Sequence, residues 1–178
     1  MILQLGISCD TVTVREAKEE GGVGQPSGKN VAHLPSDFSV SRFIESVASI
    51  ESQCFSDPWS LDMIGESLNT GLDKYFLLVE RGEAAGYCVF RVIAGEGELF
   101  RIGVLPAYRG LGYGKKLMDG LVEYSRENGV SAISLEVRES NRPARNLYKS
   151  YGFEEESIRR DYYRNPVESA IILWKRGI

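Results

Sequence analysis

The fold is decided by the stretch Val104-Leu105-Pro106-Ala107-Tyr108-Arg109-Gly110-Leu111-Gly112-Tyr113-Gly114-Lys115. A strand-like run ends at Val104, a glycine-rich turn follows, and a helical pattern begins directly after the turn. Glycines let the backbone approach an anion closely, and the free N–H groups at a helix start point towards it. The stretch therefore predicts a cradle for a phosphate or pyrophosphate group. The alternative is a tight turn that needs glycine for its geometry alone.

Two other phosphate-binding motifs do not fit this turn. A P-loop needs glycines five residues apart before its lysine, but Arg109 stands five residues before Gly114. The dinucleotide fingerprint GxGxxG needs a third glycine where Lys115 stands. That fingerprint also opens a βαβ unit, whereas the strands before this turn are predicted to be connected by hairpins.

Regular patterning extends outward from the turn in both directions. Upstream, apolar residues at helical spacing predict a helix over 43–50, capped by Ser41, and a second helix over 61–68. The remaining predicted elements are strands at 75–80, 84–93 and 98–104, a helix ending at Asn128-Gly129, a strand at 132–137, a helix at 142–151 capped by Asn141, and strands at 154–159 and 169–175. This order predicts an α/β fold, with a mixed sheet and helices on both faces.

The length of 178 residues is typical of one domain. Residues 15–30 combine glycine, proline and charge without apolar periodicity, which is linker composition. We therefore predict an N-terminal extension or linker over 1–30, with one short strand within 1–14, and a single domain over 31–178.

Composition limits the chemistry that we expect. With 21 basic and 25 acidic side chains the formal net charge is −4, so the basic surface typical of nucleic-acid binding is absent. The single histidine, His33, excludes most zinc sites and histidine-dependent triads unless it serves itself, and we expect no metal. Cys9, Cys54 and Cys88 form no CxxC pair, which favours a reduced, cytoplasmic protein. No signal peptide is recognisable, and no apolar run approaches the roughly 20 residues that span a bilayer.

Further sequence blocks accompany the glycine turn. They are Leu135-Glu136-Val137-Arg138, Ser140-Asn141, Asn146-Leu147-Tyr148 and Tyr151-Gly152-Phe153. Together with Arg109-x-x-Gly112-x-Gly114, which resembles the acetyl-CoA motif Gln/Arg-x-x-Gly-x-Gly/Ala, they are similar to the GNAT acetyltransferase superfamily. Within it, the blocks 55–60, 98–102 and 158–163 resemble the bacterial ribosomal-protein-alanine N-acetyltransferases of RimI type. The resemblance covers about residues 31–178.

The resemblance implies a GNAT fold, whose mostly antiparallel sheet is splayed at the acetyl-CoA site. It implies that Glu136 is the general base for the substrate amine and that Tyr148 is the general acid for the departing CoA thiolate. The residues implied to bind acetyl-CoA are Ile102, Gly103, Val104 and Asn141 at the pantetheine arm, and Arg109, Gly110, Leu111, Gly112, Tyr113, Gly114 and Lys115 around the pyrophosphate. Gly110 and Leu111 stand where this subgroup often has a basic pair, and Lys115 and Lys116 are placed to supply that charge.

The alternation of residues along the predicted strand 132–137 agrees with the role of Glu136. Ile133, Leu135 and Val137 share one face of their strand, so Glu136 points from the other face, where it is free to reach a cleft. The alternative is a surface charge or an ion pair with Arg138 on the same face.

The other candidate residues also have simpler alternatives. Tyr148 lies seven residues after Asn141, nearly two helical turns, so one helix face presents a cap amide and a phenol; alternatively, Tyr148 is a core aromatic residue. Trp59, Tyr162 and Tyr163 are candidates for a substrate wall that accepts a small first residue, with ordinary packing as the alternative.

The sequence thus predicts acetyl transfer from acetyl-CoA to the N-terminal α-amine of a protein. Attack is expected to be direct, because no cysteine falls in a motif position. The resemblance points to an N-terminal alanine of a small-subunit ribosomal protein, and the acidic balance suits a basic partner. We expect no direct nucleic-acid or membrane partner. The alternatives are a non-catalytic acetyl-CoA-binding module and a small-amine acetyltransferase on the same fold.

Overall fold

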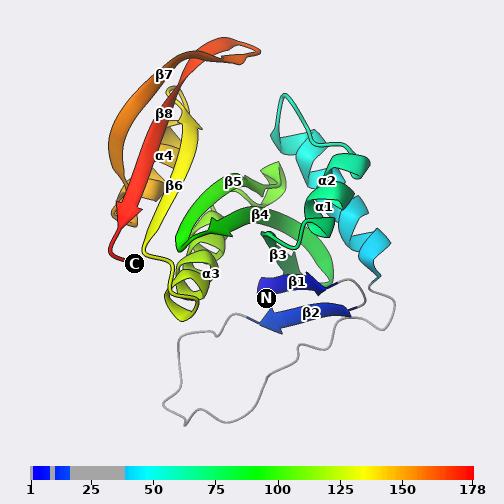
Figure 1. Cartoon of the computed structure of the whole chain (residues 1–178). Coiled ribbons are helices and arrows are strands. Elements are labelled where there is room, and N and C mark those ends of the chain that lie inside the picture. Colours follow the sequence, from blue (N-terminus) through cyan, green and yellow to red (C-terminus); the bar gives the residue numbers. More distant parts are fainter. Residues whose placement is uncertain (1, 9–10, 17–38) are drawn as a thin grey trace.

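The computed structural model describes residues 2–8, 11–16 and 39–178 (Figure 1). Within these ranges the elements are β1 (Ile2–Ser8), β2 (Thr11–Glu16), α1 (Val40–Cys54), α2 (Leu61–Asn69), β3 (Asp73–Glu80), β4 (Glu83–Ile93), β5 (Glu96–Val104), the 3-10 turn η1 (Pro106–Tyr108), α3 (Tyr113–Glu127), β6 (Ala132–Arg138), α4 (Arg142–Ser150), β7 (Glu154–Arg164) and β8 (Val167–Arg176). From α1 onward the predicted order of helices and strands is confirmed.

The strands form one sheet in the order β2-β1-β3-β4-β5-β6-β8-β7. Neighbouring strands are antiparallel, with the exception of β5 and β6, which run parallel. The α3 helix lies between β5 and β6 in the chain, and a crossover helix is the usual connection for a parallel pair. The predicted mixed, mostly antiparallel sheet is therefore confirmed.

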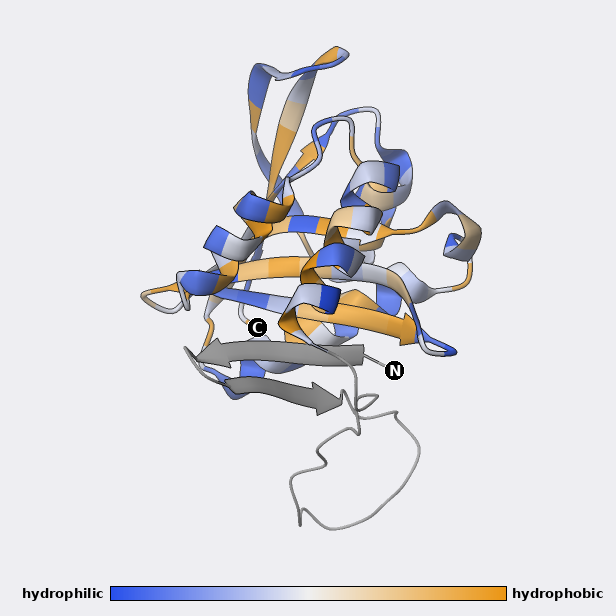
Figure 2. Ribbon diagram, turned by 90° about the vertical axis from the view of Figure 1, so that its right-hand side faces the viewer, coloured by the Kyte–Doolittle hydropathy of each residue, from blue (hydrophilic) through white to orange (hydrophobic). Residues whose placement is uncertain are grey.

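The helices cover both faces of the sheet because the strands alternate apolar residues on two sides. Tyr75 and Leu77 of β3 pack with α1 and α2, whereas Phe76 and Leu78 of the same strand pack with α3. Figure 2 shows the central strands as largely hydrophobic, while the helices carry hydrophilic residues on their outer sides. The central strands β3, β4 and β5 are thus buried on both faces, with one core cluster on each side.

Several boundaries differ from the sequence expectation. The N-cap of α1 is Ser39, whose side chain accepts a hydrogen bond from the backbone N–H of Arg42, so the predicted cap at Ser41 was wrong. β7 extends to Arg164, well beyond the predicted end at residue 159. Nearly all of β7 is exposed because it is an edge strand, so it lacks the apolar alternation that marks a strand in a sequence.

The N-terminal region contributes two strands where one short strand was predicted. β1 pairs with β2 and also with β3, in the register Ile2↔Leu78, so it extends the sheet beyond β3. The predicted domain boundary at residue 30 lies outside the described residues, and it stays a prediction. Cys9 and His33 also lie outside the described residues. Among the helices that the structure describes, none has the length and apolar character needed to cross a bilayer.

Candidate active site

The sheet opens between β5 and β6. These parallel strands pair only along Glu96–Leu99 and Ala132–Leu135. Beyond this point β5 continues to Val104 and β6 to Arg138 without pairing to each other, and the two ribbons diverge in Figure 1. The β4–β5 ladder also shifts register at this level, and such an irregularity bends a strand. The splay expected at the acetyl-CoA site is therefore present.

The end of β5 carries Ile102, Gly103 and Val104, the residues expected at the pantetheine arm. All three pair with β4 on one side, and the side towards β6 is open. The Val104 carbonyl accepts a hydrogen bond from Arg109 Nε at 3.0 Å and contacts Cys54 Sγ at 3.4 Å. The Arg109 side chain thus fastens the glycine turn to the end of the strand.

The glycine turn enters α3 through a left-handed backbone at two positions. Gly110 has φ 78° and Gly112 has φ 81°, a conformation that side-chain-bearing residues rarely adopt. Gly112 is the N-cap of α3 and supplies no side-chain acceptor for the N–H groups of the first turn. A Cβ on either glycine would meet no atom within 4 Å, so the outer side of the turn is open. An uncapped helix start beside open space fits an anionic group.

Gly114 also allows close packing between α3 and α4. An ideal Cβ on Gly114 would lie 3.3 Å from Leu147 Cδ2. The Tyr151 hydroxyl, just after α4, donates to Asp119 of α3 and lies 2.9 Å from the Lys115 carbonyl oxygen. These contacts fix the helix start relative to α4.

The larger side chains of the turn remain accessible. Leu111 is 61% exposed. The ring of Tyr113 packs against Tyr108 at a centroid distance of 5.7 Å, and Lys116 Nζ lies 5.5 Å from the Tyr113 ring centroid. Lys115 and Lys116 lie in the first turn of α3, so they place basic charge beside Gly110 and Leu111, which carry none.

Helix α4 positions Asn141 and Tyr148. The Asn141 side chain caps α4 by accepting a first-turn backbone N–H at 3.2 Å, which confirms the predicted cap. Tyr148 is buried, and this burial, followed by electrostatic contact with Cys88 and Tyr163, raises its pKa. Among the described residues no hydrogen bond engages the Tyr148 hydroxyl, so a buried, protonated phenol is available.

Glu136 lies on the other face of β6 from the core that contains Tyr148. Its Oε1 accepts a hydrogen bond from Arg159 Nη1 at 2.5 Å, and its side chain is 22% exposed. Tyr162 of the same strand interacts with the Glu136 carboxylate, and this interaction, followed by burial, raises the pKa of Tyr162. The carboxylate is therefore held by Arg159 of β7, a partner that the sequence reasoning did not anticipate.

An irregularity in β7 brings these side chains to Glu136. Between Arg159 and Tyr163, three residues of β7 oppose a single residue of β8, and Asp161 in the middle has φ 52°. Such a bulge re-aims the side chains beside it. Tyr162 and Tyr163 consequently pack edge to face, with ring centroids 5.1 Å apart, although they are adjacent in the chain.

Arg138 does not form the ion pair with Glu136 that the sequence left open. Its guanidinium pairs with Glu168 at 3.4 Å, donates to Ser56 Oγ at 3.3 Å, and lies 4.0 Å from the Tyr163 ring centroid. Burial, followed by the charge of Glu136, raises the pKa of Tyr163 to about 12. Arg138 thus joins the loop between α1 and α2 to the β7–β8 hairpin.

Trp59 is fixed by a buried carboxylate that the sequence reasoning missed. Its backbone N–H donates to Glu51 at 2.7 Å, and the fully buried Glu51 also accepts from the Tyr87 hydroxyl. The Arg101 guanidinium lies 4.0 Å from Glu51 and 5.4 Å from the Trp59 ring centroid. The sequence did carry a signal for Glu51, because this carboxylate lies one helical turn after Val47 on the apolar face of α1.

The structure therefore brings together two of the three predicted substrate residues. Tyr162 and Tyr163 lie beside Glu136, whereas no ring contact or hydrogen bond joins Trp59 to either tyrosine within the described residues. The link to Trp59 is indirect, through its loop and the Ser56–Arg138 hydrogen bond.

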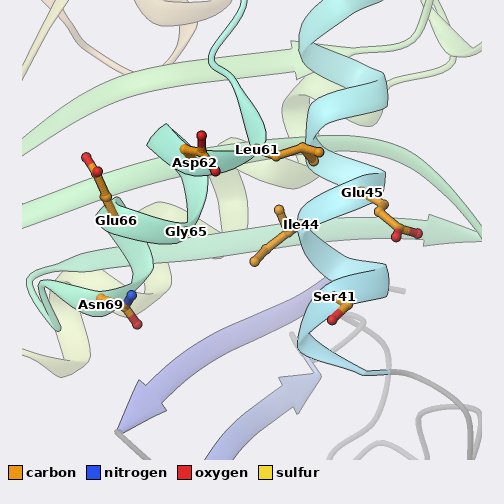
Figure 3. Close-up of a pocket in the computed structure, with 8 residues that line it drawn as sticks. All are labelled: Ser41, Ile44, Glu45, Leu61, Asp62, Gly65, Glu66 and Asn69. Atoms are coloured by element: carbon orange, nitrogen blue, oxygen red, sulfur yellow. The ribbon is translucent and has the colours of Figure 1, made fainter.

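A separate groove lies on the outer side of α1 and α2 and shares no residue with these sites. Figure 3 shows its lining: Ser41, Ile44, Glu45, Leu61, Asp62, Gly65, Glu66 and Asn69. In the part of the chain that the structure describes, no three histidine, cysteine, aspartate or glutamate side chains cluster as metal ligands would.

Comparison with known proteins identifies related chains. Residues 44–153 match the family described as acetyltransferase (GNAT) family. The [ribosomal protein bS18]-alanine N-acetyltransferase of Haemophilus influenzae is 37% identical over 134 residues, which span 72% of this chain and 89% of the relative. The protein of the same name from Escherichia coli K12 is 38% identical over 128 residues, spanning 70% and 84%.

A solved structure agrees with the same grouping. The crystal structure of the ribosomal-protein-S18-alanine N-acetyltransferase from Escherichia coli superimposes with a TM-score of 0.71 at 33% sequence identity. The match covers 75% of this chain and 87% of that one. The similarity therefore extends over most of both chains.

Proposed function

Because this chain belongs to the GNAT family of acetyltransferases, we propose that it transfers an acetyl group from acetyl-CoA to the N-terminal alanine of a ribosomal protein. The observation that carries this proposal is the 37–38% identity, over most of the chain, to relatives named for that reaction on ribosomal protein bS18. The family uses acetyl-CoA as its acetyl donor.

The geometry of the opening supports an acetyl-CoA site. Bound there, acetyl-CoA would supply an activated thioester. Its pantetheine arm would pair with the open edge of β5 and reach Asn141, and its pyrophosphate would lie on the uncapped start of α3. The positive φ angles of Gly110 and Gly112 and the empty space beside them fit a ligand that touches backbone directly.

Two side chains flank the opening with opposite proton chemistry. An α-amine has a pKa near 7.7–8.0 and is mostly protonated at neutral pH, so it needs a base before it attacks. Glu136, an acceptor on one face of β6, would take that proton directly or through one water. Tyr148, whose burial keeps the phenol protonated, would return a proton to the departing thiolate.

The peptide would enter beside Tyr162 and Tyr163, whose rings adjoin Glu136. Trp59 would contribute to the same wall through the loop that Arg138 fastens to the hairpin. A crowded aromatic wall favours a first residue as small as alanine. The net charge of −4 suits a basic substrate tail. The cytoplasmic location stays a prediction.

The test is a peptide screen with the full chain. Peptides that begin Ala-Arg and contain an internal lysine are incubated with acetyl-CoA, and mass spectrometry locates the acetyl group. We expect the α-amine to be modified, because its proton is held more weakly than that of a lysine side chain by roughly 2.5 pKa units. The same peptide with a blocked N-terminus should not react. Acetylation mainly on lysine, or only on free small amines, would contradict the N-terminal assignment. Binding of acetyl-CoA without any turnover would favour a non-catalytic module.

A further inference from the structure

The Glu136 carboxylate is bonded to a cation that the proposed chemistry does not use. Arg159 of β7 pairs with Ala170 of β8, while Glu136 of β6 pairs with Ile172 two residues along β8. The Arg159 side chain therefore crosses over β8 to reach Glu136 Oε1 at 2.5 Å. Ala170, which faces the same side, is small and fully buried, so it leaves room for this crossing.

A second side chain of β7 packs against the pair. The Arg159 guanidinium lies 5.5 Å from the Tyr162 ring centroid, and the Glu136 carboxylate acts electrostatically on the Tyr162 phenol. Glu136, Arg159 and Tyr162 therefore lie together on the face of the sheet beside the opening. The Arg159 side chain is 56% exposed, so its guanidinium can move into solvent without leaving a buried charge unpaired.

A second carboxylate, Glu98 of β5, lies near Glu136. Burial, followed by repulsion from the Glu136 charge, raises the pKa of Glu98. The other groups that face this cluster are Arg91 of β4 near Glu98, Arg138 of β6, Tyr163 of β7 and Asp57 of the α1–α2 loop. Arg91 and Arg138 are already paired with Asp73 and Glu168. Arg159 is therefore the cation that is bonded directly to Glu136, and its charge offsets the repulsion between the Glu98 and Glu136 carboxylates.

We propose that Arg159 is a positioning residue that keeps the Glu136 carboxylate aimed at the opening between β5 and β6. This inference rests on the proposed role of Glu136 as the base. When the substrate amine gives its proton to Glu136, the charge that binds Arg159 is neutralised, and the exposed guanidinium relaxes into solvent. Arg159 itself touches neither substrate nor acetyl-CoA in this scheme.

The neighbouring residue supplies a matched control. Arg160 carries the same charge on the same strand and is exposed, and it forms no ion pair within the described residues. Arg159→Gln, Arg159→Lys and Arg160→Gln would be compared with the parent chain, using one Ala-Arg peptide, with kcat, KM and acetyl-CoA affinity measured for each.

We expect Arg159→Gln to lower kcat by roughly 10- to 100-fold, the cost of a misplaced catalytic group, with KM and acetyl-CoA affinity within about twofold. Arg159→Lys should recover most of the parent kcat, because it keeps a cation beside Glu136, and Arg160→Gln should match the parent.

Several results would contradict the proposal. A kcat of Arg159→Gln equal to that of the parent would overturn the positioning role. A rise in kcat/KM would show instead that Arg159 competes with the substrate amine. Full activity of Glu136→Gln would reject the proposed base itself, whereas an inactive Glu136→Gln beside an unchanged Arg159→Gln would reject the role of Arg159 alone.

Discussion

The ring of Phe90 on β4 covers Gly97 on β5 so closely that no side chain fits between them. An ideal Cβ on Gly97 would lie 2.1 Å from Phe90 Cζ. Phe90 is fully buried, and its ring also meets Tyr124 of α3 edge to face. The ladder between β4 and β5, just before the sheet opens, therefore depends on a glycine.

We expect Gly97→Ala to lower the free energy of unfolding by about 2 kcal/mol, because the ring must shift within a closely packed core. Urea unfolding followed by circular dichroism would measure this change. Gly65→Ala in α2 is the control, since its Cβ would lie at an ordinary 4.0 Å from Ile44 Cδ1. It should stabilise the chain by up to about 1 kcal/mol through helix propensity. Equal stability of the two variants would contradict the packing argument.

The sequence predicted best those features that depend on neighbouring residues. Helix periodicity, the Asn141 cap and the position of the glycine-rich turn are local, so the order of elements from α1 onward was recovered. The end of β7 was missed because an exposed edge strand has no apolar face to mark it. The pairing of β1 with β3 joins residues about 75 positions apart, which no local pattern specifies.

The same distinction applies to the candidate site. The face from which Glu136 points follows from strand alternation, and the structure agrees with it. Its partner Arg159 is 23 residues away, and a bulge in β7 sets which side chains meet it. The buried Glu51 is held by Tyr87, 36 residues away. Contacts of this kind depend on the assembled sheet, and the sequence named none of them.

A second prediction concerns the cradle at Gly112. Gly112→Asp should weaken acetyl-CoA binding by at least about tenfold, or 1.4 kcal/mol, because it adds negative charge where the pyrophosphate is expected. Gly129→Asp is the matched control, since Gly129 has φ 67° and an equally open Cβ position at the far end of α3. Both variants carry a similar backbone cost, of about 1–2 kcal/mol. Calorimetry that finds equal acetyl-CoA affinity in both would place the cradle elsewhere.

A third prediction separates chemistry from binding. Glu136→Gln and Tyr148→Phe should each lower kcat by about 10²- to 10⁴-fold, the usual cost of losing a positioned acid or base. Acetyl-CoA affinity, measured by calorimetry, should stay within about twofold because neither group is expected at the pyrophosphate. Glu139→Gln, an exposed carboxylate just after β6, should keep the parent rate. Parent turnover in both test variants would favour the non-catalytic module.

A fourth prediction concerns the carboxylate buried under the α1–α2 loop. Glu51→Ala leaves the Tyr87 hydroxyl, the Trp59 N–H and the Arg101 guanidinium without their shared acceptor. Removing one partner of a buried pair costs about 3–5 kcal/mol, which urea unfolding would detect. Glu45→Ala, on the exposed side of the same helix, should change stability by less than about 0.5 kcal/mol. A Glu51→Ala chain as stable as Glu45→Ala would mean that the network contributes nothing.

The last prediction follows from a buried phenol in β3. Burial raises the pKa of Tyr75 to about 12, against an ordinary value near 10 in the unfolded chain. The folded chain thus holds this proton more tightly, so the stability contributed by the neutral phenol is complete below pH 10 and is lost as the pH rises to about 12. Urea midpoints between pH 9 and 11.5 should fall steadily in the parent. Tyr75→Phe should begin lower, because it loses the 2.8 Å hydrogen bond to Ser67, but its midpoint should fall less steeply. Parallel slopes in the two chains would show that ionisation of Tyr75 is not coupled to unfolding.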